Sequence, residues 1–242
     1  MDKVFFESSL NKKIFCYLSE PASHQKKIVI MSHGFRSSSI GPARTFVDFS
    51  RLLVSHGFST FRFDQPNSGN SDGEYLQSSF NEWVDTIVYF SKRFINSGYK
   101  VALLGQSMGA AASVVASARE ELKGEIVCLL LWVPGPVLVF NKPANKIYEE
   151  EGEKYRGTFW LEAKKADFMG CLRKFKGKMH LVYGEDDRYV SKKSRDEVIA
   201  EVKKKGQKVM ILKGQNHSPW KYDMAQEVYQ EELKIIQDCF GS

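Results

Sequence analysis

Hydrophobic and polar residues follow one another along this chain in an order that predicts alternating strands and helices. Short apolar runs predict buried strands, and apolar residues that recur every three or four positions predict amphipathic helices. Residues 4–6 and 14–17 flank a polar turn and predict an N-terminal hairpin. The alternation predicts an α/β fold with a mostly parallel central sheet and helices on both faces. Strands are expected at 28–32, 60–63, 101–104, 126–133, 179–183 and 208–212, and helices at 44–56, 80–95, 110–118, 192–204 and 222–239.

One segment, residues 137–176, interrupts this alternation because it is rich in charged and aromatic residues. We therefore expect a core domain made of residues 1–136 and 177–242, with 137–176 inserted as a cap over the C-terminal edge of the sheet. Its aromatic residues suit the packing of a small cap and the lining of a pocket equally well. Trp160 is the residue that we expect to contact a substrate. The acidic run at 149–151 is expected to be solvated. The aromatic residues of the segment include Phe140, Tyr148, Tyr155, Phe159, Trp160 and Phe168.

A candidate nucleophile follows the apolar run at 101–104, in Gly105-Gln106-Ser107-Met108-Gly109. Gly-x-Ser-x-Gly between a strand and a helix is the pattern of a nucleophile elbow, a strained turn that exposes the serine hydroxyl above the sheet. The glycines are needed where a side chain would collide with a neighbouring strand or helix. Unpaired N–H groups at the start of the helix stabilise negative charge on a substrate oxygen. The pattern predicts a serine hydrolase with Ser107 as its nucleophile, the alternative being a tight turn with an uninvolved serine.

A serine hydroxyl needs a general base, usually a histidine, to become nucleophilic. Among the five histidines, His217 lies after the last predicted strand and before the last helix, where it can reach Ser107. His33 ends an earlier strand, and we expect it to orient or pack the neighbouring loop. His24, His56 and His180 are expected to be structural or exposed.

The carboxylate that orients the base is expected just after the strand at 179–183. Three acidic residues follow Gly184 there, and only some of them can face inward. Asp187 is the predicted acid because Gly184 and Val190 frame it as Gly-x-x-Asp-x-x-Val. Asp186 is the alternative.

The order Ser107, Asp187, His217 is the order of nucleophile, acid and base in α/β-hydrolases. The chain resembles that superfamily over nearly its whole length. It is also similar to small bacterial carboxylesterases of the cinnamoyl or feruloyl esterase group, in its His-Gly-Phe, its Gly-Gln-Ser-Met-Gly, its loop at 64–73 and its short cap. The superfamily resemblance implies that the backbone N–H groups of Phe35 and Met108 form the oxyanion hole.

Two residues depart from the pattern of that esterase group. Asn67 replaces the first glycine of the loop at 64–73, and Ala110 stands where many of those enzymes have a second glycine after the elbow. Neither belongs to the predicted triad, but Asn67 is expected to reshape the loop.

Composition narrows the class of protein. The chain has 242 residues, enough for one large domain, and a formal net charge of +6. Its lysines are scattered and no basic run is interleaved with aromatic residues, so we expect no nucleic-acid partner. The N-terminus lacks the apolar core of a signal peptide and no window is long enough to span a membrane, which predicts a cytoplasmic protein without a membrane partner.

The cysteines are too far apart for a metal or redox motif and are expected to be reduced packing residues. They are Cys16, Cys128, Cys171 and Cys239.

These observations predict an enzyme that cleaves carboxylic esters of small molecules, with short-chain acyl or aryl groups, through an acyl-enzyme. The chemistry needs no metal and no organic cofactor. A thioesterase or acyl-peptidase with the same triad is the first alternative. A non-catalytic binding protein built on the same fold is the second, although it has no need to keep Ser107, Asp187 and His217 together. The sequence leaves a homodimer open.

Overall fold

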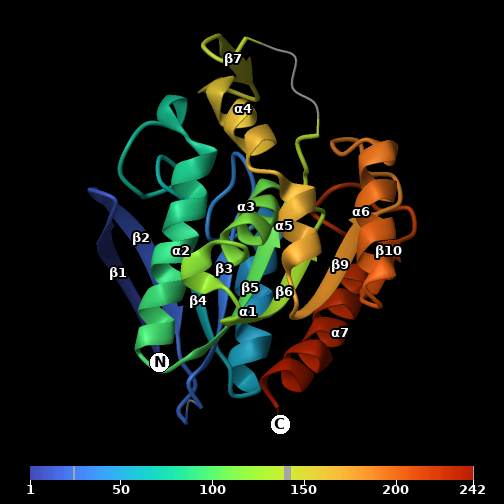
Figure 1. The fold of residues 1–242 in the computed structure, drawn as a ribbon. Coiled ribbons are helices and arrows are strands. Elements are labelled where there is room, and N and C mark those ends of the chain that lie inside the picture. The colour runs from blue at the N-terminus through green and yellow to red at the C-terminus, as the bar shows by residue number, and fades with distance from the viewer. Residues whose placement is uncertain (24, 139–142, 242) are drawn as a thin grey trace.

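The computed structural model describes residues 1–23, 25–138 and 143–241, and they form a central sheet of eight strands in the order β1-β2-β4-β3-β5-β6-β9-β10 (Figure 1). The hairpin β1–β2 and the pair β2–β4 are antiparallel, and the other neighbours in the sheet are parallel. The predicted fold class is confirmed. The strands are β1 (Asp2–Ser9), β2 (Lys12–Ser19), β3 (Lys27–Ser32), β4 (Ser59–Phe63), β5 (Lys100–Gln106), β6 (Ile126–Trp132), β9 (Lys178–Gly184) and β10 (Lys208–Leu212).

Helices cover both faces of the sheet. On one face α2 contacts α3, and α3 contacts α5, while α1 and α7 contact each other on the other face (Figure 1). The predicted helices are all present, with ends that differ from the prediction by two residues or fewer. Within the described residues, no helix is long and apolar enough to cross a membrane. The helices are α1 (Thr45–Ser55), α2 (Phe80–Asn96), α3 (Met108–Ser117), α4 (Thr158–Lys165), α5 (Phe168–Lys174), α6 (Lys192–Lys204) and α7 (Tyr222–Phe240).

The N-terminal hairpin turns at Leu10 and Asn11, which have φ angles of 52° and 63°. Two left-handed residues in a two-residue turn match the right-handed twist of the flanking strands. The hairpin therefore forms the antiparallel edge of the sheet, as its polar turn predicts.

The segment predicted as a cap contains a second, two-stranded sheet. Strands β7 (Ile147–Glu150) and β8 (Glu153–Arg156) form an antiparallel hairpin, and with α4 they lie beyond the strand ends at the top of Figure 1. Helix α5 instead lies beside α3 and buries Phe168 and Leu172. The division into core and cap stays a prediction, and α5 is the part of the segment that packs with the helices of the sheet. Phe140 and His24 lie outside the described residues.

The parallel strands bring the predicted site loops to one edge of the sheet. Strands β3, β5, β9 and β10 run in the same direction, so the residues that follow them meet at their carboxyl ends. These loops contain residues 33–35, 107–108, 185–187 and 213–217.

Candidate active site

The elbow at Ser107 has the strained backbone that the Gly-x-Ser-x-Gly pattern predicts. Ser107 lies between β5 and α3 with φ 53° and ψ −119°, a conformation that only surrounding structure can hold. A Cβ atom on Gly105 would lie 2.4 Å from the Cα of Ala110, and one on Gly109 would lie 2.2 Å from the carbonyl oxygen of Ser32. Both glycines are therefore required by close backbone contacts. Ala110 itself is buried in the first turns of α3.

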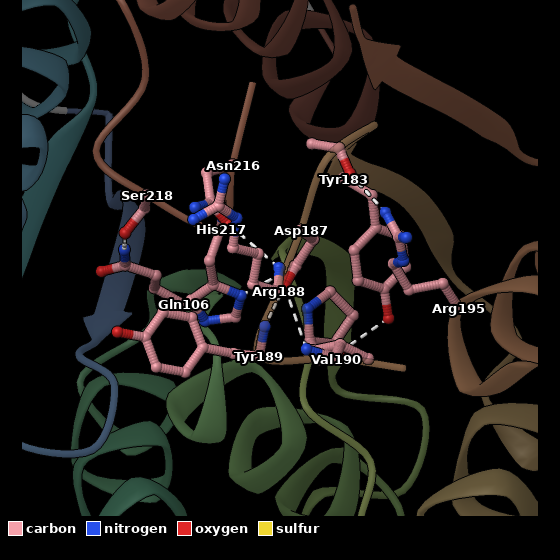
Figure 2. A network of polar contacts seen from close by, with 12 residues as sticks. Gln106, Tyr183, Asp187, Arg188, Tyr189, Val190, Arg195, Asn216, His217 and Ser218 are labelled. Atoms are coloured by element: carbon pink, nitrogen blue, oxygen red, sulfur yellow. Dashed lines mark hydrogen bonds and ion pairs between the residues drawn. The ribbon is translucent and has the colours of Figure 1, made fainter. Parts of the chain in front are cut away.

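His217 and Asp187 form a hydrogen-bonded pair, with 2.8 Å between His217 Nδ1 and Asp187 Oδ2 (Figure 2). The other carboxylate oxygen of Asp187 accepts the N–H groups of Tyr189 and Val190, both at 2.9 Å. Burial raises the pKa of Asp187, but these three hydrogen bonds outweigh it and the pKa lies below its usual value. The carboxylate keeps the proton of His217 on Nδ1 and leaves Nε2 free to accept another. Asp186, the alternative acid, is exposed.

The loops that carry the acid and the base are fastened to each other (Figure 2). A Cβ atom on Gly184 would lie 2.1 Å from the carbonyl oxygen of Asn216, so the two loops touch at this glycine. The side-chain oxygen of Asn216 accepts the N–H of Arg188 at 3.0 Å and that of His217 at 2.8 Å. Arg195 of α6 donates to the carbonyl of Gly184 at 2.6 Å. These contacts fix the distance between acid and base.

Two further residues contact the loop of the candidate base, and sequence reasoning missed both. Gln106, the variable residue before Ser107, donates from Nε2 to Ser218 Oγ at 2.5 Å and so ties the elbow to the residue after His217 (Figure 2). The ring of Tyr189 lies 5.2 Å from the imidazole of His217, between ring centroids. The only sequence signal for either residue is its position beside a predicted triad residue.

His33 orients the predicted oxyanion loop through its two ring nitrogens. Its Nε2 accepts the N–H of Gln65 at 2.9 Å, so the proton lies on Nδ1, which donates to the carbonyl of Gly34 at 2.8 Å. Burial lowers the pKa of His33 and favours this neutral form. The N–H of a trans peptide points away from its carbonyl, so this bond turns the N–H of Phe35 away from His33. Met108 is the first residue of α3, where an N–H has no acceptor in the helix.

The predicted residues meet at one cavity of about 1090 Å³. Its walls include Phe35, Ser107, Met108, Trp160 and His217. Asp187 is buried and reaches the cavity only through His217. The structure therefore brings together all six residues that the sequence singles out.

Charged residues also lie on the walls of this cavity. Arg36 and Lys193 are cationic, and Glu150, Glu151 and Glu197 are acidic. Arg36 Nη1 lies 3.3 Å from a carboxylate oxygen of Glu151 and 3.7 Å from one of Glu150, which joins the β7–β8 hairpin to the oxyanion loop. The acidic run at 149–151 is thus largely exposed, as expected, but two of its residues also face the cavity.

The ring of Phe35 lies at the centre of an aromatic cluster that joins the core to the inserted segment. Its centroid is 5.0 Å from that of Trp160, the predicted substrate contact, and 4.7 Å from that of Phe159. The residue before Phe35 touches the elbow, because a Cβ atom on Gly34 would approach the Cβ of Ser107 to 3.1 Å. The other rings around Phe35 are those of Tyr75, Trp83 and Tyr155.

Asn67 takes the conformation that a glycine would have in the loop at 64–73. Its φ is 67°, in the left-handed region that asparagine tolerates better than most residues. Its side-chain amide donates to Glu82 at 3.0 Å and to the carbonyl of Gln77 at 3.3 Å, and accepts from Lys12 at 3.1 Å. The substitution therefore keeps the turn and ties it to α2.

Comparisons with known proteins agree with this architecture. A monoglyceride lipase homolog of monkeypox virus is 29% identical over 110 residues, which are 44% of this chain and only 38% of that protein. The structure of Est1E from Butyrivibrio proteoclasticus with bound ferulic acid superposes with a TM-score of 0.83 at 19% identity, covering 98% of this chain and 100% of that one. A monoacylglycerol lipase from Paleococcus ferrophilus gives a TM-score of 0.73 at 17% identity, covering 93% and 99%. These structures share the α/β-hydrolase fold.

The family profile of the serine aminopeptidases S33, Hydrolase_4, matches residues 23–145, which is half of the chain. The match contains the predicted oxyanion loop and the elbow. The chain therefore belongs to the Hydrolase_4 family of serine aminopeptidases S33 and has the α/β-hydrolase fold.

Proposed function

We propose that this protein is a serine hydrolase that cleaves carboxylic esters through an acyl-enzyme, with Ser107, Asp187 and His217 as its triad. The observation that carries the proposal is the 2.8 Å hydrogen bond between His217 and a buried Asp187 at the cavity that holds the strained Ser107. A histidine held in this tautomer is the base that a serine nucleophile requires. Similarity to esterases and lipases supports the same class of reaction.

In this mechanism the hydroxyl of Ser107 attacks the acyl carbonyl and its proton passes to Nε2 of His217. The N–H groups of Phe35 and Met108 stabilise the oxyanion, and the positive end of α3 adds to that stabilisation. The tetrahedral intermediate collapses when His217 gives the proton to the leaving alkoxide. Water, deprotonated by the same histidine, then releases the acid and restores Ser107. Asp187 stays ionised throughout and stabilises the imidazolium.

The cavity favours neutral esters with an aryl or short acyl group. Phe35 and Trp160 offer aromatic surface close to Ser107, and Val137 and Leu138 add aliphatic surface. Among the wall residues that the structure describes, the charged side chains are two cations and three carboxylates, a balance that does not favour a polyanion such as an acyl-CoA thioester. We therefore expect the protein to hydrolyse acyl thioesters only weakly.

An aminopeptidase is the second candidate, and a specific feature favours it. Glu150, Glu151 and Glu197 place carboxylates on the cavity walls, where they could receive the ammonium group of a peptide N-terminus. The family description names this activity as well. Alanine p-nitroanilide, tested beside p-nitrophenyl acetate, separates the two reactions.

The test is a burst-phase assay with p-nitrophenyl esters of graded acyl length. We expect one equivalent of p-nitrophenol per active site in a rapid phase, lost in Ser107→Ala. Ser117→Ala is the matched control because it removes a hydroxyl at the far end of α3, where this group donates to the carbonyl of Val114 at 2.8 Å. Labelling by a fluorophosphonate should mark the peptide that contains Ser107. A folded protein that gives neither burst nor label with any ester would contradict the proposal and favour a non-catalytic binding protein.

A further inference from the structure

A buried carboxylate lies below the candidate site and takes no part in the mechanism above. Glu232 of α7 is fully buried, and its two oxygens accept the indole N–H of Trp132 at 2.8 and 2.9 Å. His180 of β9 donates from Nδ1 to the same carboxylate at 2.9 Å. Burial raises the pKa of Glu232, and the hydrogen bonds from His180 and Trp132 oppose this. A carboxylate without solvent is costly, so its two buried donors are needed to keep it there.

Trp132 connects this carboxylate to the elbow. It is the last residue of β6, opposite Gln106 in the sheet, and its carbonyl accepts the N–H of Ser107 at 2.8 Å. This bond holds the strained residue directly. A strained conformation persists only where its surroundings over-determine it, so the position of Trp132 matters to the position of Ser107.

The indole of Trp132 also supports the loop of the candidate base. Its ring meets the ring of Trp220 edge to face, with centroids 5.5 Å apart, and Trp220 is three residues beyond His217. The next peptide N–H, that of Val133, donates to Val182 of β9, the strand that leads to Asp187. One residue therefore holds the nucleophile through its backbone carbonyl and packs against the loop of the base through its side chain, in a strand bonded to that of the acid.

Ring contacts and hydrogen bonds both act on this indole. The rings around it stack or tilt against its faces, and ring contacts of this kind have broad geometry. The hydrogen bonds from the indole N–H to the two oxygens of Glu232 orient the N–H edge of the ring toward α7. The rings in contact with Trp132 are Phe46, Phe49, Trp220 and Tyr229.

We propose that Glu232 is a positioning residue, which holds the indole of Trp132 and through it aligns Ser107 with His217. The inference rests on the proposed function. If the hydrogen bond between Glu232 and Trp132 is lost, Ser107 becomes misaligned although Glu232 itself does not contact the substrate. Misplacement of reacting groups by a fraction of an ångström to 1 Å costs roughly ten- to a hundredfold in rate.

Two variants remove the hydrogen bond from opposite sides. Glu232→Met keeps a side chain of similar length but offers no oxygen to the indole, and Trp132→Phe keeps an aromatic ring but loses the N–H donor. The matched control is Phe240→Leu on the same helix. Phe240 is buried against Phe58 at the end of α7, away from Trp132, so this variant weakens the packing of α7 without changing the anchor.

The experiment compares kcat and KM for p-nitrophenyl acetate at 25 °C with the melting temperature of each folded protein. In Glu232→Met and Trp132→Phe we expect kcat to fall about tenfold or more with KM within about twofold. In Phe240→Leu we expect kcat within about twofold of the parent even though the melting temperature falls. Unchanged kcat in both anchor variants, or an equal fall in Phe240→Leu, would overturn the inference.

Amide hydrogen exchange at Ser107 gives a readout that does not depend on turnover. Because this N–H is bonded to Trp132, its exchange should be faster in Glu232→Met than in Phe240→Leu. Equal exchange in the two variants would overturn the inference. If the parent itself fails to hydrolyse any ester, the proposed function is wrong, and the exchange comparison alone then decides whether Glu232 positions Ser107.

Discussion

Replacing Asp187 by asparagine tests the acid of the proposed triad with little change in shape. One side-chain oxygen accepts the N–H groups of Tyr189 and Val190, and the asparagine oxygen can do the same. Its NH₂ group must then face Nδ1 of His217. A donor at this place forces Nδ1 to be the acceptor and moves the ring proton to Nε2. The histidine is then unable to take the proton of Ser107.

The expected magnitude follows from this change of tautomer. In a serine protease triad the same substitution lowers kcat by about 10⁴. We expect a fall in kcat of roughly 10³- to 10⁴-fold here, or about 4 to 5.5 kcal/mol at 1.36 kcal/mol per factor of ten. Asp187 is buried behind His217, so KM should stay within about threefold.

The assay is steady-state hydrolysis of p-nitrophenyl acetate, with thermal unfolding to show that each variant is folded. Asp186→Asn is the matched control, since it makes the same change one residue away at an exposed side chain. It should retain kcat within about twofold. The reasoning is refuted if Asp187→Asn keeps more than about a tenth of the parent kcat, or if Asp186→Asn loses as much.

Three further outcomes are expected from the same structure. Gly109→Ala places a methyl group 2.2 Å from the backbone oxygen of Ser32, so its melting temperature should fall by about 4 to 8 °C or more, roughly the effect of 2 kcal/mol or more; an unchanged melting curve would show that the elbow can relax. Trp160→Ala removes an aromatic side chain from the cavity wall, so kcat/KM for esters with an aromatic acyl group should fall about tenfold relative to acetate esters. An unchanged ratio would show that the acyl group binds elsewhere. Burial lowers the pKa of His33, so the unfolded chain binds a proton that the folded chain does not, and stability should decrease as pH falls below about 6.5. The slope from this group is at most about 1.4 kcal/mol per pH unit, and urea unfolding of parent and His33→Asn between pH 5 and 8 should show a flatter dependence in the variant.

The spacing around Asp187 shows why a local sequence pattern can predict the residue that pairs with His217. Gly184 is required because the loop of His217 touches its backbone, and Val190 supplies an N–H to the carboxylate. Both residues lie within three positions of Asp187, so they leave a pattern in the sequence even though the contact at Gly184 comes from a distant loop. The strands and helices of the core are predictable for a similar reason, because their burial repeats with a fixed period.

Contacts between distant segments leave no such pattern. Gln106 meets Ser218 across 112 positions, and Trp132 meets Glu232 across 100. The contact between the β7–β8 hairpin and the loop at Arg36 also leaves no local pattern. The sequence of the hairpin is charged and its strands carry few apolar residues, yet Tyr148 and Tyr155 stack across it with centroids 5.7 Å apart. Only the tertiary structure shows that this hairpin reaches the oxyanion loop.

Phe35 is placed to affect both the rate of the chemical step and the choice of substrate. Its backbone N–H is the proposed oxyanion donor, whereas its ring packs against Tyr155, Phe159 and Trp160 of the inserted segment. Any movement of that segment therefore acts on the peptide that His33 orients through Gly34. Substitutions that enlarge the cavity at these aromatic positions should change kcat together with specificity, because the wall that selects the acyl group also supports the donor that stabilises its oxyanion.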